Sequence, residues 1–114
     1  MTRDEILNMP AGCKIDHLIA ENVGMFDGRY YSRNIQSTML VVEAMHDRGY
    51  WVEMFTQAGP GGSVEYCVEF IPVSLSRPSE PGAYFASTST FPLAICRAAL
   101  LTVMEREESL KLEE

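Results

Sequence analysis

Apolar residues recur at helical spacing in the first part of the chain, and these repeats predict its helices. Thr2 is a suitable N-cap for a short helix that ends near Asn8. A second helix is predicted from Cys13 to Val23, with Gly24 as its end. Its core face carries Ile15, Leu18, Ile19 and Val23, and its polar residues Lys14, Asp16, Glu21 and Asn22 lie elsewhere on the helical wheel.

A third helix follows, and Ser32 or Asn34 is its natural N-cap. The helix is expected to run to about Arg48 and to end at Gly49, a residue that readily takes the left-handed conformation beyond a helix end. Its apolar stripe consists of Ile35, Thr38, Met39, Val42 and Met45.

The central part of the chain alternates in the manner of strands. Residues 50–57 and 64–71 predict two strands joined by the Gly-rich turn 58–63, and residues 83–88 predict a third strand after a Pro-rich loop. One face of the second strand carries Val64, Tyr66, Val68 and Phe70, and the other carries Glu65, Cys67, Glu69 and Ile71. We therefore expect a sheet with helices on the first face.

A final apolar helix is predicted over residues 92–104, capped by Ser89 or Thr90 and followed by a glutamate-rich end at 105–114. The expected fold is α+β, with a three-stranded antiparallel meander packed by helices in the order α-α-α-β-β-β-α. Residues 1–104 are expected to form one domain. This outline resembles a double-stranded RNA-binding domain, but the start of the last helix lacks the lysines with which such a domain grips phosphate.

Composition narrows the function. The chain has 114 residues and a formal net charge of −7, which disfavours direct binding of nucleic acid. It contains no apolar run near the roughly 20 residues needed to span a bilayer and no signal-peptide pattern, so we expect no membrane contact and a location in the cytoplasm. Three widely spaced cysteines favour free thiols over disulfides.

Few residues are arranged as catalytic or metal-binding groups. Cys13 and His17 share a helix face but supply only two ligands, so neither a metal nor a cofactor is expected. A catalytic role for Cys67 or Cys96 requires a base such as His17 or His46, and the sequence does not bring them together. We therefore expect binding and not catalysis.

The best candidate for a ligand site precedes the third helix. There an arginine and aromatic rings lie near a helix N-terminus, a combination that suits a nucleotide-like anion. The predicted ligand-binding residues are Arg29, Tyr30, Tyr31, Ser32, Arg33, Trp51, Tyr84 and Arg97. The alternative is that Ser32 or Asn34 only caps the helix while the tyrosines pack against Trp51 or Phe26.

Four stretches resemble the small bacteriophage proteins of the phage ABA sandwich domain family. They are residues 1–12, the pair Tyr31 and Ser32, residues 45–51 and residues 92–101. Where relatives usually have Thr-Asp after Tyr-Ser, this chain has Arg33 and Asn34. The resemblance implies helices on a sheet and a phage origin, so the expected location becomes the host cytoplasm, and it implies no activity.

Two hypotheses follow for a small acidic protein of this kind. In the first, it is a non-catalytic accessory protein that counters host defence by sequestering a nucleotide immune signal. In the second, it is a protein-interaction module whose acidic surface or tail blocks a host nucleic-acid-binding protein. A homo-oligomer is expected in addition, because Trp51, Met54 and Phe55 give one short strand more apolar surface than a single buried face needs.

Overall fold

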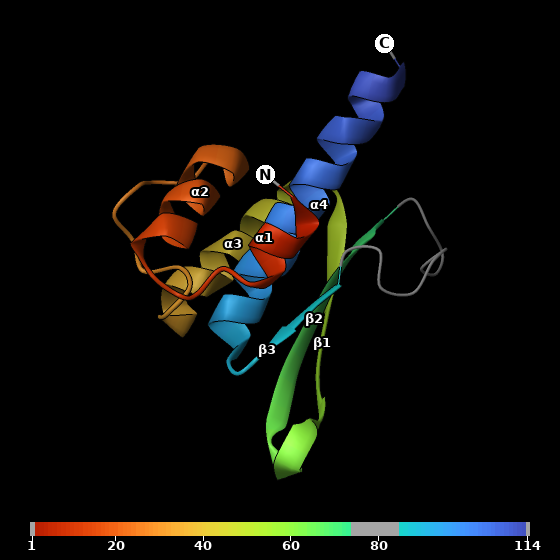
Figure 1. Ribbon diagram of the computed structural model, residues 1–114. Coiled ribbons are helices and arrows are strands. Elements are labelled where there is room, and N and C mark those ends of the chain that lie inside the picture. The colour runs from red at the N-terminus through yellow and green to blue at the C-terminus, as the bar shows by residue number, and fades with distance from the viewer. Residues whose placement is uncertain (1, 74–84, 114) are drawn as a thin grey trace.

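The computed structural model describes residues 2–73 and 85–113 and has an α+β fold (Figure 1). Its helices are α1 (Arg3–Leu7), α2 (Cys13–Val23), α3 (Ile35–Asp47) and α4 (Phe91–Glu113). Its strands are β1 (Tyr50–Ala58), β2 (Val64–Pro72) and β3 (Phe85–Thr88), and a short 3-10 helix at Pro60–Gly62 joins the first two. The predicted α+β class is confirmed.

Helix α4 is the centre of the core. Every residue from Leu93 to Val103 is buried, which is the pattern of a helix covered on all sides. The sheet contacts α4 through β2 and β3, and the helices α1, α2 and α3 contact it as well. Beyond this buried part, the helix continues to Glu113 and its C-terminal turns extend past the other elements (Figure 1).

The described strands form an antiparallel sheet in the order β1-β2-β3. Tyr50 lies opposite Pro72 and Ala58 lies opposite Val64, so β1 and β2 are paired along their whole length. Val68 and Phe70 of β2 are fully buried in the core, as the alternation of the sequence predicts. The far half of the β1-β2 hairpin extends beyond the helices (Figure 1).

Local signals placed the ends of the first three helices correctly, whereas α4, predicted over residues 92–104, runs on to Glu113. The Thr2 side chain accepts a hydrogen bond from the Glu5 amide at 3.2 Å and caps α1. Gly24 ends α2 in the left-handed conformation, with a φ of 80°. Asn34 caps α3 by accepting a hydrogen bond from the Ser37 amide at 3.1 Å. Of the two residues proposed as the α3 cap, Asn34 therefore has that role.

Several side chains differ in burial from the sequence expectation. Ile35 and Met39, which were assigned to the apolar stripe of α3, are 51% and 41% exposed. The buried face of α3 consists of Thr38, Val41, Val42 and Met45, because α4 contacts the helix from that side. Asp16 was assigned to the polar side of α2 and is buried.

Three residues of β2 differ as well. Val64, on the predicted core face, is 52% exposed, whereas Ile71 on the other face is buried. Cys67 is fully buried, although its face of β2 is the one away from the core helices. It lies in the central strand, opposite Phe55 on β1 and Ser87 on β3. A short side chain between two neighbouring strands is hidden by its surroundings even on an outer face.

Two further predictions concern the third strand and membrane-spanning helices. The third strand begins at Phe85, and residues 83 and 84 of the predicted strand lie outside the described residues. Among the described residues, no helix combines the length and the apolar character that crossing a bilayer requires.

Candidate functional site

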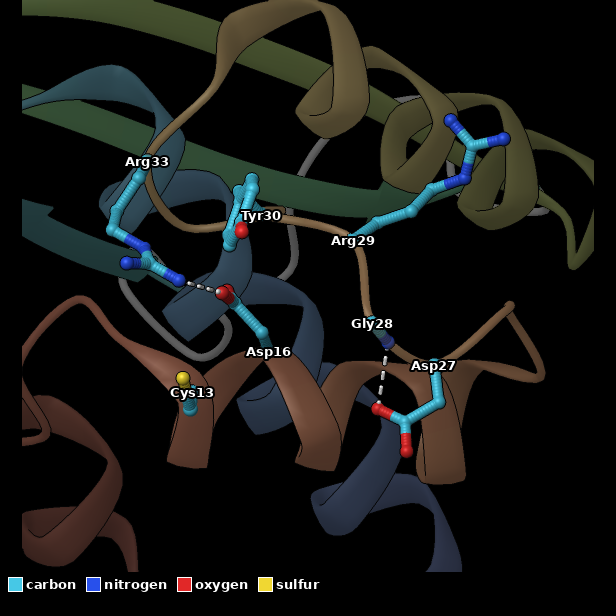
Figure 2. Close-up of a pocket in the computed structure, with 7 residues that line it drawn as sticks. All are labelled: Cys13, Asp16, Asp27, Gly28, Arg29, Tyr30 and Arg33. Atoms are coloured by element: carbon cyan, nitrogen blue, oxygen red, sulfur yellow. Dashed lines mark hydrogen bonds and ion pairs between the residues drawn. The ribbon is translucent and has the colours of Figure 1, made fainter.

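A small pocket lies between the start of α2 and the chain that leads into α3 (Figure 2). Its lining consists of Cys13, Asp16, Asp27, Gly28, Arg29, Tyr30 and Arg33. Three predicted ligand-binding residues, Arg29, Tyr30 and Arg33, therefore lie around one pocket. Its volume is about 80 Å³, whereas sites that enclose a drug-sized ligand measure about 300–1,000 Å³. The pocket as it stands admits a small ion or a single functional group.

The buried carboxylate of Asp16 organises this pocket. One carboxylate oxygen accepts a hydrogen bond from the Ser32 amide at 2.7 Å, and the other lies 3.2 Å from Nη2 of Arg33. The Asp16 side chain is 6% exposed and that of Arg33 is 42% exposed. The hydrogen bond to Asp16 raises the pKa of the Arg33 guanidinium, which stays charged.

Arg33 has a second contact, with the ring of Tyr30. Its guanidinium carbon lies 4.5 Å from the centre of the Tyr30 ring, within the range of a cation–π interaction. Tyr30 is 58% exposed, so one part of the ring contacts the cation and the rest faces solvent. Arg33, which was predicted to bind an anion, is thus paired with both Tyr30 and Asp16.

Tyr31 and Ser32 have structural contacts and do not line the pocket. The Tyr31 hydroxyl donates a hydrogen bond to the Phe26 carbonyl at 2.6 Å, and burial raises the pKa of Tyr31. The Ser32 hydroxyl accepts a hydrogen bond from the Gly12 amide at 3.0 Å. Both side chains are 1% exposed. This contact is with the backbone of Phe26, which is itself 81% exposed. Packing of the tyrosines against Phe26 or Trp51 therefore stays a prediction.

Thr38 of α3 completes the same arrangement. Its hydroxyl is hydrogen-bonded to the Tyr31 carbonyl and, at 2.8 Å, to the Asn34 carbonyl. The segment before α3 is therefore tied to α2 through Asp16 and to α3 through Thr38.

The other predicted ligand-binding residues lie elsewhere. Arg29 lines the pocket, but its side chain is directed away from Asp16 and Arg33 (Figure 2). Trp51 is 57% exposed on β1 and has an edge contact with His46 at 6.4 Å between ring centres. It does not line the pocket. Tyr84 lies outside the described residues.

Arg97 is buried in α4 and is hydrogen-bonded to Met9, in the segment between α1 and α2. Its Nε and Nη2 donate hydrogen bonds to the Met9 carbonyl at 3.1 Å and 2.7 Å. Burial lowers the pKa of this guanidinium. Arg97 does not line the pocket that Arg29 and Arg33 share, so the three arginines do not converge there.

The pair proposed as two metal ligands is at the surface. Cys13 and His17 are both exposed on α2, and His17 lies 3.2 Å from an oxygen of Asp27 and 3.8 Å from an oxygen of Glu21. Within residues 2–73 and 85–113, no cluster of three His, Cys, Asp or Glu residues is placed to hold a metal ion.

Sequence reasoning missed Asp16 as the residue that joins the site together. The helical wheel assigns Asp16 to a polar side, and no local spacing relates it to Ser32 or Arg33. A buried aspartate in the first turn of α2 becomes understandable only when the later segment lies across that helix end.

The chain matches no protein-family model, no curated protein and no solved structure. The resemblance to the phage ABA sandwich domain accordingly remains a hypothesis, and function has to be argued from the residues described above.

Proposed function

We propose that the protein acts by binding another protein, as an accessory factor of phage origin whose acidic surface contacts a basic partner. The observation that carries the proposal is the extension of α4. The helix runs on to Glu113, and its C-terminal turns stand clear of the other elements (Figure 1). Residues 105–114 contain five glutamates and two basic residues.

Electrostatics favours a basic partner for this segment. The C-terminal end of a helix carries a partial negative charge, so glutamates there are in an unfavourable position. A positively charged surface compensates both the glutamates and the helix end. The rest of the chain is also acidic, which favours encounter with the same class of partner and disfavours nucleic acid.

The pocket geometry supports this proposal over nucleotide sequestration. Arg33 is paired with Asp16, and Arg97 is hydrogen-bonded to the Met9 carbonyl. A pocket of about 80 Å³ leaves no enclosed space for a nucleotide. An extended acidic helix needs no enclosed space, because it binds through its outer surface.

The test is capture of partners from a bacterial lysate by two charge variants. In the tail variant, Glu105, Glu107, Glu108, Glu113 and Glu114 become Gln, which removes charge and keeps helix propensity. In the control, five exposed carboxylates of the body become the matching amides, namely those of Asp4, Glu5, Glu21, Glu43 and Asp47. Circular dichroism establishes that both variants keep their helices.

We expect a basic protein to be captured by the wild type and the control, to be lost with the tail variant, and to dissociate as salt is raised. Equal capture by the tail variant would remove the electrostatic basis of the proposal. Calorimetry with cyclic nucleotides and ADP-ribose derivatives tests the competing function. Tight binding of one of these that Arg33→Ala abolishes would support sequestration instead.

A further inference from the structure

Strand β1 is nine residues long, lies at the edge of the sheet and has few of the features that usually protect such edges. Among the described strands, β1 pairs only with β2 and is an edge of the sheet. It contains no proline, lysine or arginine, and its one charged residue is Glu53. Natural edge strands are usually short, charged or interrupted, because an open edge accepts another strand.

The hydrogen bonds at the two ends of the hairpin show which backbone groups face this edge. The Gly59 amide bonds to the Ser63 carbonyl at 2.8 Å, and the Val73 amide bonds to the Gly49 carbonyl at 2.9 Å. In an antiparallel ladder such pairs alternate with non-bonded pairs. The odd-numbered residues of β1 therefore point their amides and carbonyls toward β2, and Val52, Met54, Thr56 and Ala58 point theirs outward.

The side chains around this edge are accessible as well. Every residue from Glu53 to Ala58 is exposed, and Met54 is 44% exposed. This part of the hairpin extends beyond the helices (Figure 1), so the helices do not shield it from a second chain.

We propose that two copies of this chain dimerise by antiparallel pairing of their β1 strands around a two-fold axis at Met54, which joins the two sheets into one. In this register all nine residues of each β1 are opposed, and Met54 lies opposite Met54 of the second copy. Val52 lies opposite Thr56 of the second copy, so the outward backbone groups of both residues exchange hydrogen bonds.

Overlap and charge together favour this register and a second copy as the occupant, because the axis at Met54 opposes the most residues and brings no like charges together. With the axis at Met54, Glu53 lies opposite Phe55 of the second copy. With the axis at Glu53, the two carboxylates would lie directly opposite each other, which is destabilising. The strand is thus complementary to itself in the register with the greatest overlap. The inference rests on the β1 edge alone and does not depend on the proposed function of α4.

The first test is the mass of the full chain in solution, measured by sedimentation equilibrium over a range of concentrations. We expect association toward twice 12.8 kDa. Met54→Lys places two cations at the axis and should weaken dimerisation by about tenfold or more. Val64→Lys is the matched control: Val64 is an exposed apolar residue of the same hairpin, 52% exposed, and belongs to β2. This control should dimerise like the wild type.

The second test reports the register. In a Cys13→Ser background, Met54→Cys should form a disulfide between two copies when oxidised glutathione is present, since Cα atoms of a bonded antiparallel pair lie about 5.5 Å apart. Val64→Cys should not form one efficiently. A folded wild-type chain that stays monomeric at all concentrations overturns the proposal. So does a dimer that Met54→Lys leaves intact, or one that both lysine variants weaken equally.

Discussion

Asp16 and Arg33 form an ion pair of 3.2 Å that joins the first turn of α2 to the segment leading into α3. The same carboxylate accepts a hydrogen bond from the backbone amide of Ser32. A buried carboxylate is stable only when it is paired and hydrogen-bonded, and both conditions hold here. The pair therefore fixes the position of the pocket residues.

Replacing Asp16 by Asn should lower the free energy of unfolding by about 1–3 kcal/mol, since it removes the ion pair and weakens a buried hydrogen bond. Urea denaturation followed by circular dichroism measures this change. The control Glu43→Gln alters an exposed carboxylate of α3 and should stay within about 0.5 kcal/mol of the wild type. An Asp16→Asn variant as stable as this control would show that the ion pair contributes nothing.

Thiol labelling should distinguish the three cysteines. Cys13 is exposed, whereas Cys67 and Cys96 are fully buried. In the native protein, an aromatic disulfide reagent should modify one thiol quickly and the other two only as the chain unfolds. Cys13→Ser should remove the fast phase and leave the slow one. Rapid modification of two or three thiols in the folded chain would contradict the burial of Cys67 and Cys96.

Stability should fall at alkaline pH because of Cys96. Burial raises the pKa of this thiol, so it stays protonated in the folded chain while an unfolded thiol ionises above about pH 8.5. The unfolded state then binds fewer protons, and each such group lowers the free energy of unfolding by up to about 1.4 kcal/mol per pH unit. Below this range the thiol has no effect.

Denaturation at a series of pH values from about 9 to 11 measures that slope. Tyr31, whose pKa burial also raises, adds to it above about pH 10. Cys96→Ala should make the free energy of unfolding fall less steeply between pH 9 and 10, by up to about 1.4 kcal/mol per pH unit, which corresponds to one proton. The substitution also lowers stability overall. If the free energy of unfolding of this variant falls with pH as steeply as that of the wild type, groups other than Cys96 cause the loss of stability at alkaline pH.

The stability of the protein should depend on which residue replaces Gly24. Its φ of 80° lies in the left-handed region, and a Cβ added there meets no atom within 4 Å. Gly24→Ala should therefore cost about 1 kcal/mol through backbone strain alone. Gly24→Asn should cost less, because asparagine tolerates this conformation. Thermal unfolding of the two variants checks the order, and equal losses would point to a cause other than the backbone.

Much of the fold could be predicted because its signals are local. The α2 boundaries, the Thr2 cap and the Gly24 end depend on residues within one or two helical turns. The alternation of β2 likewise predicted that Val68 and Phe70 are buried. Where the surroundings decided burial, as for Ile35 and Met39, the pattern along one helix was insufficient, since both residues are apolar and yet exposed.

The candidate site was predictable only in part. Tyr30 and Arg33 are neighbours in sequence, and both line the pocket. Their partner Asp16 is seventeen residues from Arg33 and belongs to another helix. Arg97 is one of the predicted ligand-binding residues, but the structure places it elsewhere. Its contact with the Met9 carbonyl spans eighty-eight residues, and no local pattern indicates it.

By itself, the sequence determined where the first three helices begin and end and where the buried positions of the central strand lie, because capping and periodicity act over a few residues. Only the tertiary structure decided that Asp16 is buried against Arg33, that Arg97 holds Met9, and that the edge of β1 faces solvent. Those outcomes depend on which distant segments meet, and a buried charge finds its partner only when the chain has folded around it.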